Sequence, residues 1–215
     1  MALPEPPTYS AGELERRARD FLSKRYGDAI SIPVDVDLLL EQLEGVVLDI
    51  WPGLRTNHGV EGMVLRDPET GDLLVYIDEW LADNVPARYR MTVAEELGHL
   101  ILHRKVIDAV HTIDDFREFQ RHYRNVEMER NAKRFAAAIL MPADAVLSEA
   151  ARLYRLFVRA AGFGDPGAIK RQLARQLAKR FQVSSQSMEY RLTEWPMRVF
   201  ERVDQAMKDQ LDFLE

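Results

Sequence analysis

The stretch TVAEELGHLILH, from Thr92 to His103, carries two carboxylates and two imidazoles within a short segment. If it forms a helix, which turns by about 100° per residue, its polar side chains fall on one arc of about 100°. They belong to Thr92, Glu95, Glu96, His99 and His103. Nearly every other position is apolar or glycine, so we predict a helix that is buried on most of its circumference. A buried carboxylate needs a partner charge or it takes up a proton, so this stripe has to face a group that neutralises it.

A divalent metal ion provides such a charge. Two residues four apart on a helix can both ligate one ion, and a carboxylate between them can act on a bound water. Glu95 and His99 have this spacing, with Glu96 between them as the candidate catalytic base. His99 and His103 have it too, so His103 is an alternative ligand if the ion sits one turn further along. A buried polar network without any metal is the third interpretation of the same stripe.

The third ligand of such an ion has to come from elsewhere in the chain. The stretch VEMERNAKRFAAAILMP has helical periodicity and offers two carboxylates, Glu127 and Glu129. Ala132 and Ala136 fall within about 60° of Glu129 around this helix, whereas Glu127 points almost the opposite way. A narrow face of small residues suits close packing against another helix, so we predict Glu129 as the third ligand.

These two helices need neighbouring elements that hold them in place. Apolar spacing and turn residues predict helices at 10–26 and 34–45, and strands at 46–51, 60–66 and 73–77. The turn DPETG between the last two strands favours a hairpin. After the break GFGDPG, a helix capped by Asp165, the turn QVSS and a second short helix are similar to a helix-turn-helix.

Charge is unevenly spread along the chain. The whole chain has a formal charge of −6, but the segment 151–198 has ten Lys or Arg against three acidic residues, a net of +7. A basic patch can contact nucleic acid or an acidic protein, although a solvated helix face gives the same pattern. The candidate DNA- or partner-binding residues are Lys170, Arg171, Arg175, Lys179 and Arg180.

Composition excludes several classes of protein. The chain of 215 residues has no cysteine, which excludes disulfides, thiolate metal sites and a cysteine nucleophile. No apolar run approaches the roughly 18 residues of a membrane-spanning helix, and the N-terminus lacks the pattern of a signal peptide. We therefore expect a cytoplasmic protein without a membrane partner.

Two motifs together resemble the ImmA/IrrE family of metallo-endopeptidases. RYRMTVAEELGHLILH followed by ERNAKRFAAAILMP is similar to the family pattern R-x-x-x-T-x-A-H-E-L-G-H-x-x-x-H, then E-x-x-A-x-x-F-A-x-x-L-x-M-P. IPVDVDLLLEQLEGV, Gly62, LLVYID and LAKRFQVSSQSMEYRL extend the resemblance over residues 31–192. It implies an α+β, zincin-like fold in which a small sheet packs on the active-site helix. It also implies cleavage of a DNA-binding repressor.

The resemblance assigns roles to individual residues. In the family, zinc is held by two histidines of the first motif and a downstream glutamate, and the motif glutamate is the general base. His99 matches the second histidine, Glu129 the downstream glutamate and Glu96 the base. His103 matches the trailing histidine, a supporting position. Glu95 stands where the first histidine belongs, so this chain departs from the family at one ligand.

Glu95 changes the expected metal chemistry. A set of Glu95, His99 and Glu129 carries two negative charges rather than one, which weakens the ion as a Lewis acid and raises the pKa of its water. The added oxygen donor shifts the preference from zinc toward manganese, and loss of the metal is the extreme outcome.

We therefore expect a metal-dependent endopeptidase of a regulatory type, which cleaves a specific protein such as a transcriptional repressor. The alternative is a catalytically degenerate member that binds a repressor or DNA without hydrolysis. The expected fold is α+β and helix-rich. A flexible leader (1–10) precedes a zincin-like domain (11–161) with a small three-stranded sheet, and a helical, helix-turn-helix-like module (162–215) follows.

Overall fold

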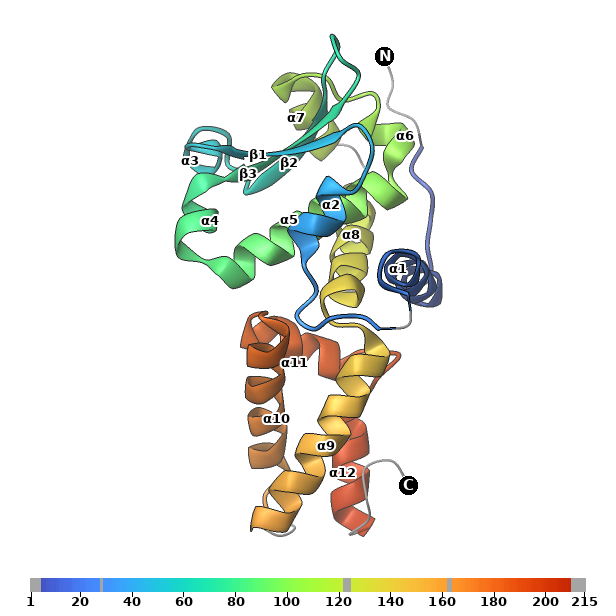
Figure 1. Cartoon of the computed structure of the whole chain (residues 1–215), viewed down its shortest axis with the longest axis vertical. Coiled ribbons are helices and arrows are strands. Elements are labelled where there is room, and N and C mark those ends of the chain that lie inside the picture. Colours follow the sequence, from blue (N-terminus) through green and yellow to red (C-terminus); the bar gives the residue numbers. More distant parts are fainter. Residues whose placement is uncertain (1–4, 28, 122–124, 162–163, 210–215) are drawn as a thin grey trace. The chain divides into compact units, whose positions relative to one another are not determined.

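The computed structural model describes residues 5–27, 29–121, 125–161 and 164–209. Its contacts divide the chain into two compact units, Met1–Leu140 and Met141–Glu215. The predicted domain boundary after residue 161 lies one helix later along the chain, at the end of α9 (Ala143–Ala161). That helix packs against helices of the second unit (Figure 1).

The first unit contains the predicted three-stranded sheet, with strands β1 (Val46–Trp51), β2 (Gly62–Arg66) and β3 (Leu73–Asp78). Their order is β1-β3-β2, and β2 pairs with β3 as the antiparallel hairpin that the DPETG turn predicts. β1 pairs with β3 in parallel, and the chain between them forms the short helix α3 (Leu54–His58) and then β2. With β3 in the centre, β1 and β2 are the two edge strands of the sheet, and β2 is the edge strand that matters below.

Two long helices carry the predicted motifs, α5 (Pro86–Leu102) and α8 (Asn125–Leu140). They pack closely against each other, and α5 also contacts β2 and β3. Gly98 permits the helix contact, because a Cβ at that position would lie 3.0 Å from the carbonyl oxygen of Ala132. The small-residue face of α8 therefore meets α5, as its sequence predicts, and α5 is buried on most of its circumference.

Shorter helices complete the first unit. α1 (Ala11–Tyr26) begins at a capping box formed by Ser10 and Glu13 and packs against α8. The remaining helices are α2 (Val36–Glu41), α4 (Glu79–Asn84), α6 (Arg104–Ile107) and α7 (Ile113–Arg121). Of the predicted flexible leader, residues 5–10 are described. In that part Pro6 is buried and the Tyr9 hydroxyl donates to the carbonyl oxygen of Leu102 at 2.9 Å.

The second unit is helical throughout its described part, with α9 followed by α10 (Pro166–Phe181), α11 (Ser185–Thr193) and α12 (Val199–Asp209). Asp165 caps α10 and Ser184 caps α11, and Gln182 between them takes a left-handed conformation with φ 53°. This is the predicted helix, tight turn and helix. Across 5–27, 29–121, 125–161 and 164–209, none of the helices combines the length and hydropathy needed to cross a bilayer.

Candidate functional site

The polar stripe of α5 lines a pocket of about 540 Å³ in the first unit. Glu95, Glu96 and His99 reach it from α5, and Glu129 reaches it from α8. The pocket thus gathers the predicted base and the three predicted ligands along one wall. His103 is not among the residues that line it.

His99 and Glu129 meet across the contact between the two helices. His99 Nε2 lies 3.3 Å from Glu129 Oε1, and the other carboxylate oxygen of Glu129 lies 3.9 Å from Lys133 Nζ. Burial by itself would lower the pKa of His99, but the hydrogen bond to Glu129 and the nearby carboxylates raise it. Burial would likewise raise the pKa of Glu129, but His99 and Lys133 hold it below its usual value.

His103 lies behind His99. The two Nδ1 atoms are 3.1 Å apart, and the His103 ring packs against Tyr9 with a centroid separation of 6.4 Å. Burial, together with His99, lowers the pKa of His103 to about 3, so this ring is neutral and can accept at Nδ1 the proton that His99 donates. The geometry therefore favours His103 as a support for His99, whose Nε2 is left to face the pocket.

Glu96 lies deep in the pocket, against the edge strand. A Cβ at Gly62 would come within 2.6 Å of Glu96 Oε1, so the strand approaches the carboxylate where it has no side chain. Burial, with the charges of Glu129 and Glu95, raises the pKa of Glu96 to about 8, although His99 opposes the shift. A carboxyl group held in this way is suited to proton transfer near neutral pH.

Glu95 faces a cation that the sequence analysis did not assign to the site. Its Oε1 lies 3.6 Å from Arg88 Nη1, and Arg88 Nε donates to Glu61 Oε2 at 2.6 Å. Burial raises the pKa of Glu95, and Arg88 and Lys133 counteract it. The sequence does hold a signal for this contact, because residues seven apart on a helix lie within about 20° of each other.

The positions of the donor atoms bear on whether a metal ion fits this pocket. Two ligands of one tetrahedral zinc, each at about 2.0–2.1 Å, lie about 3.3 Å apart, which is the separation of His99 Nε2 and Glu129 Oε1. Glu95 is the predicted third donor and lines the same pocket, but its carboxylate faces Arg88. Within the described residues, no three His, Asp or Glu side chains gather closely enough to form a complete set. The donor types suit a divalent ion, but the Glu95 carboxylate would have to turn from Arg88 to complete the set.

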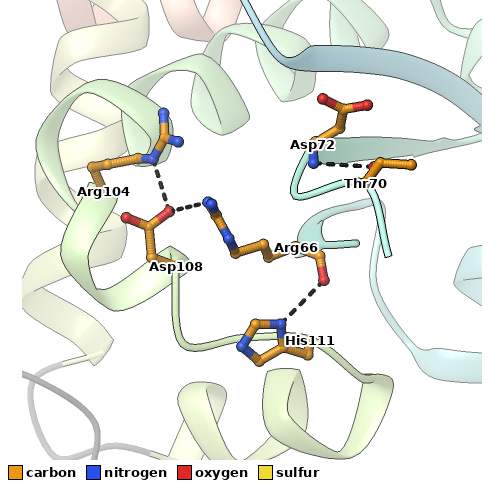
Figure 2. A network of polar contacts seen from close by, with 6 residues as sticks. All are labelled: Arg66, Thr70, Asp72, Arg104, Asp108 and His111. Atoms are coloured by element: carbon orange, nitrogen blue, oxygen red, sulfur yellow. Dashed lines mark hydrogen bonds and ion pairs between the residues drawn. The ribbon is translucent and has the colours of Figure 1, made fainter. Parts of the chain in front are cut away.

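The edge strand forms a second wall of the pocket. Gly62 and Val64 of β2 line it. At the end of the strand, the backbone N–H of Arg66 points away from β3 and donates a hydrogen bond to Val110 O at 2.7 Å. Figure 2 shows how this end is held: Asp108 Oδ1 lies 2.7 Å from Arg66 Nη1 and 2.9 Å from Arg104 Nε. His111 Nδ1 donates to the Arg66 carbonyl oxygen at 3.3 Å. These contacts tie α6 and the turn after it to β2.

The basic residues predicted to bind DNA or a partner lie on α10 of the second unit. Two of them are paired within that unit: Lys170 Nζ lies 2.5 Å from Asp204 Oδ2, and Arg171 Nη2 lies 3.4 Å from Asp165 Oδ2. The other three are exposed along the same helix, namely Arg175, Lys179 and Arg180. Two of the five charges of α10 are thus paired with carboxylates of the same unit, although Arg171 itself stays exposed.

Comparison with known proteins finds a matching family model and a similar fold. Residues 74–193 match the family model of peptidase M78, described as the IrrE N-terminal-like domain. The fold is similar to the solved structure of a Mycobacterium tuberculosis transcriptional regulator, with a TM-score of 0.53 and 18% sequence identity. The likeness covers 87% of this chain and 49% of that one, so this chain spans about half the length of that regulator. No curated protein matches the sequence.

Proposed function

The chain belongs to the family of the IrrE N-terminal-like domain, peptidase family M78, and we propose that it is a metal-dependent endopeptidase that cleaves a specific regulatory protein. The observation that supports this most strongly is the 3.3 Å separation of His99 Nε2 and Glu129 Oε1, in the pocket that also holds Glu96. A DNA-binding repressor is the partner that the family resemblance suggests, and such a partner places the activity in the cytoplasm.

His99, Glu129 and Glu95 would hold the ion, zinc or manganese, and when bound it would supply a Lewis acid beside the scissile carbonyl. His103 fixes the orientation of the His99 ring, because the Nδ1 contact at 3.1 Å leaves Nε2 directed into the pocket. A ligand that is already oriented does not have to be ordered when the ion binds.

Glu96 is the general base in this proposal. It accepts a proton from the attacking water and returns it to the amine that leaves when the peptide bond breaks. Its position against Gly62 and its burial keep the carboxylate away from bulk solvent. The proton therefore passes between Glu96 and the reacting groups rather than into the surrounding water.

The edge strand supports an extended segment of protein as the substrate. Asp78 N donates to Glu61 O at 3.0 Å, so the backbone groups of Glu61 point toward β3. Because backbone groups alternate in direction along a strand, those of the next residue, and of every second residue after it, point away from β3. Gly62 and Val64 have this outward phase, and both line the pocket. An extended peptide can add to such an edge by backbone hydrogen bonds, which would place its chain beside Glu96.

Metal analysis of the purified full chain tests the proposal. After incubation with zinc or manganese and removal of excess ion, we expect about one ion per chain, because the folded donors bind as a unit. His99→Ala and Glu129→Ala should each lose that ion while circular dichroism stays that of the parent. Absence of bound metal in the parent after both reconstitutions would reject the peptidase.

A second function is favoured by one observation. The two carboxylates at the edge of the pocket each face a cation of the chain itself, Arg88 for Glu95 and Lys133 for Glu129. Such a pocket is compatible with a non-enzymatic regulator that binds a repressor, or DNA through α10 and α11. That function predicts DNA affinity that falls steeply with salt. It is also supported if Glu95→His creates both zinc binding and proteolysis where the parent has neither.

A further inference from the structure

Arg88 lies between two carboxylates on the rim of the pocket. Its Nε donates to Glu61 Oε2 at 2.6 Å, and its Nη1 lies 3.6 Å from Glu95 Oε1. The Arg88 side chain is 44% exposed, whereas that of Glu95 is only 12% exposed. The guanidinium thus reaches from the solvent side of the rim to a carboxylate that is largely withdrawn from water.

We propose that Arg88 and a bound metal ion compete for the Glu95 carboxylate, so that Arg88 sets the metal affinity of this chain. The inference rests on the proposed function, because it assumes that the pocket is a metal site. The guanidinium neutralises Glu95 when no ion does so, and it has to give up that contact before Glu95 can act as the third ligand. A cation and a guanidinium on the same carboxylate also repel each other.

The competition follows from the residue at position 95. A neutral imidazole there, as in the family motif, would offer Arg88 no charge to pair with. Glu95 introduces an oxygen donor for the ion and at the same time a partner for the arginine that lies two turns earlier on α5. The departure from the motif therefore changes more than the ligand set, because it also brings a competing cation to the rim.

Glu61 makes the exchange feasible. Its side chain holds Arg88 through Nε, while its backbone oxygen is fixed by Asp78 N at 3.0 Å. When Arg88 releases Glu95 it keeps this second carboxylate, so the guanidinium is not left without a partner. Lys133 makes a longer contact, 3.9 Å from Glu129 Oε2, and its side chain is 55% exposed, so water screens its charge. Arg88 is therefore the main competitor and Lys133 a weak one.

Zinc and manganese affinities, measured by competition with a chromophoric chelator, test the proposal. Arg88→Gln should bind either ion about tenfold more tightly than the parent, because the competing charge is removed. Arg88→Lys, which keeps the charge, should stay closer to the parent. Glu95→Gln should bind weakly, and adding Arg88→Gln to it should give no further gain. Arg152→Gln removes an exposed arginine of the second unit that is paired with Glu149, and should change nothing.

Thermal unfolding gives a second readout that does not need activity. In metal-stripped protein, the double variant should be destabilised by less than the sum of Arg88→Gln and Glu95→Gln, because both remove the contact between these two residues. Saturating metal should then raise the melting temperature of Arg88→Gln more than that of the parent.

The outcomes separate this inference from the function on which it rests. A parent that binds metal with the same affinity as Arg88→Gln would overturn the competition and leave the peptidase standing. Absence of metal in both proteins would reject the proposed function and this inference together.

Discussion

His99 and His103 meet through like atoms, with their Nδ1 nitrogens 3.1 Å apart. One of the two nitrogens has to carry a proton and the other has to accept it. The low pKa of His103, about 3, keeps its ring neutral because burial disfavours the charged form, and a proton on His99 Nδ1 would then be accepted by His103 Nδ1. The imidazole that faces the pocket is therefore oriented by another imidazole, where many metal sites use a carboxylate or a backbone carbonyl.

The first prediction concerns this support. His103→Phe keeps an aromatic ring of similar size but removes the acceptor, so His99 loses its fixed orientation. We expect zinc affinity to fall by about ten- to a hundredfold, as for other residues that orient a metal ligand. Chelator competition measures the effect, and His58→Gln, which changes a histidine that does not line the pocket, is the control. Unchanged affinity in His103→Phe would remove His103 from the site.

The second prediction concerns the approach of the edge strand to Glu96. Gly62→Ala places a methyl group within 2.6 Å of Glu96 Oε1, so the carboxyl group or the strand has to move. We expect a loss of about 1–3 kcal/mol in the free energy of unfolding, as for overpacking elsewhere. Urea unfolding measures it. Gly164→Ala is the control, because a Cβ there meets nothing within 4 Å. Equal stability of the two variants would contradict the close contact.

The third prediction is a pH dependence. Asp115 Oδ2 accepts from Thr112 Oγ1 and from the backbone N–H groups of His111 and Thr112, and these bonds hold its pKa below the usual value. A carboxyl group with a lowered pKa stabilises the fold above its unfolded pKa and loses that contribution as the pH falls through the folded value.

Asp115→Ala should therefore be less stable than the parent at pH 7, and the difference should shrink below the unfolded pKa of about 3.9. Urea unfolding of both proteins at pH 7 and pH 3 shows the change. A difference that is the same at both pH values would mean that the carboxylate charge plays no part. Asp114→Ala, whose carboxylate makes an exposed ion pair with Arg117, is the matched control on the same turn.

The fourth prediction concerns the second unit. Arg191 is buried, and its Nε donates to the carbonyl oxygen of Met141 at 3.0 Å, which joins α11 to the chain just before α9. Arg191→Met keeps most of the side-chain volume but leaves that carbonyl without this donor. We expect a loss of about 1–3 kcal/mol in stability. Lys179→Met, at an exposed position of α10, should change stability by less than about 0.5 kcal/mol. If the two variants lose equally, the buried bond is not important.

Much of the first unit follows from its sequence, because the relevant patterns are local. Strand alternation and the DPETG turn locate the sheet, and the apolar circumference of α5 predicts its burial. The small face of α8 predicts the contact between Ala132 and α5, and it orients Glu129 toward His99. These are consequences of helix geometry that do not depend on the rest of the fold.

The remaining features depend on contacts that no local pattern contains. The charge of Arg88 and its spacing from Glu95 are visible in the sequence, but its direction is set by Glu61, which precedes the edge strand. The helix α7 has a mostly polar sequence that also carries aromatic residues. In the fold, Phe116 and Phe119 join the core formed with β2. The assignment of α9 to the second unit likewise depends on which helices it meets.

The contact of Gly98 with the backbone of Ala132 has a further consequence for the pocket. Gly98 lies one residue before His99, and Ala132 lies three residues after Glu129. Both donors are therefore attached close to the point where the two helices touch. In the proposed metal site they would form a preorganised chelate, because a bound ion would meet two arms whose conformational entropy was lost when the protein folded. In that proposed site the entropy cost of ligation would fall mainly on the third arm, Glu95, whose carboxylate faces Arg88.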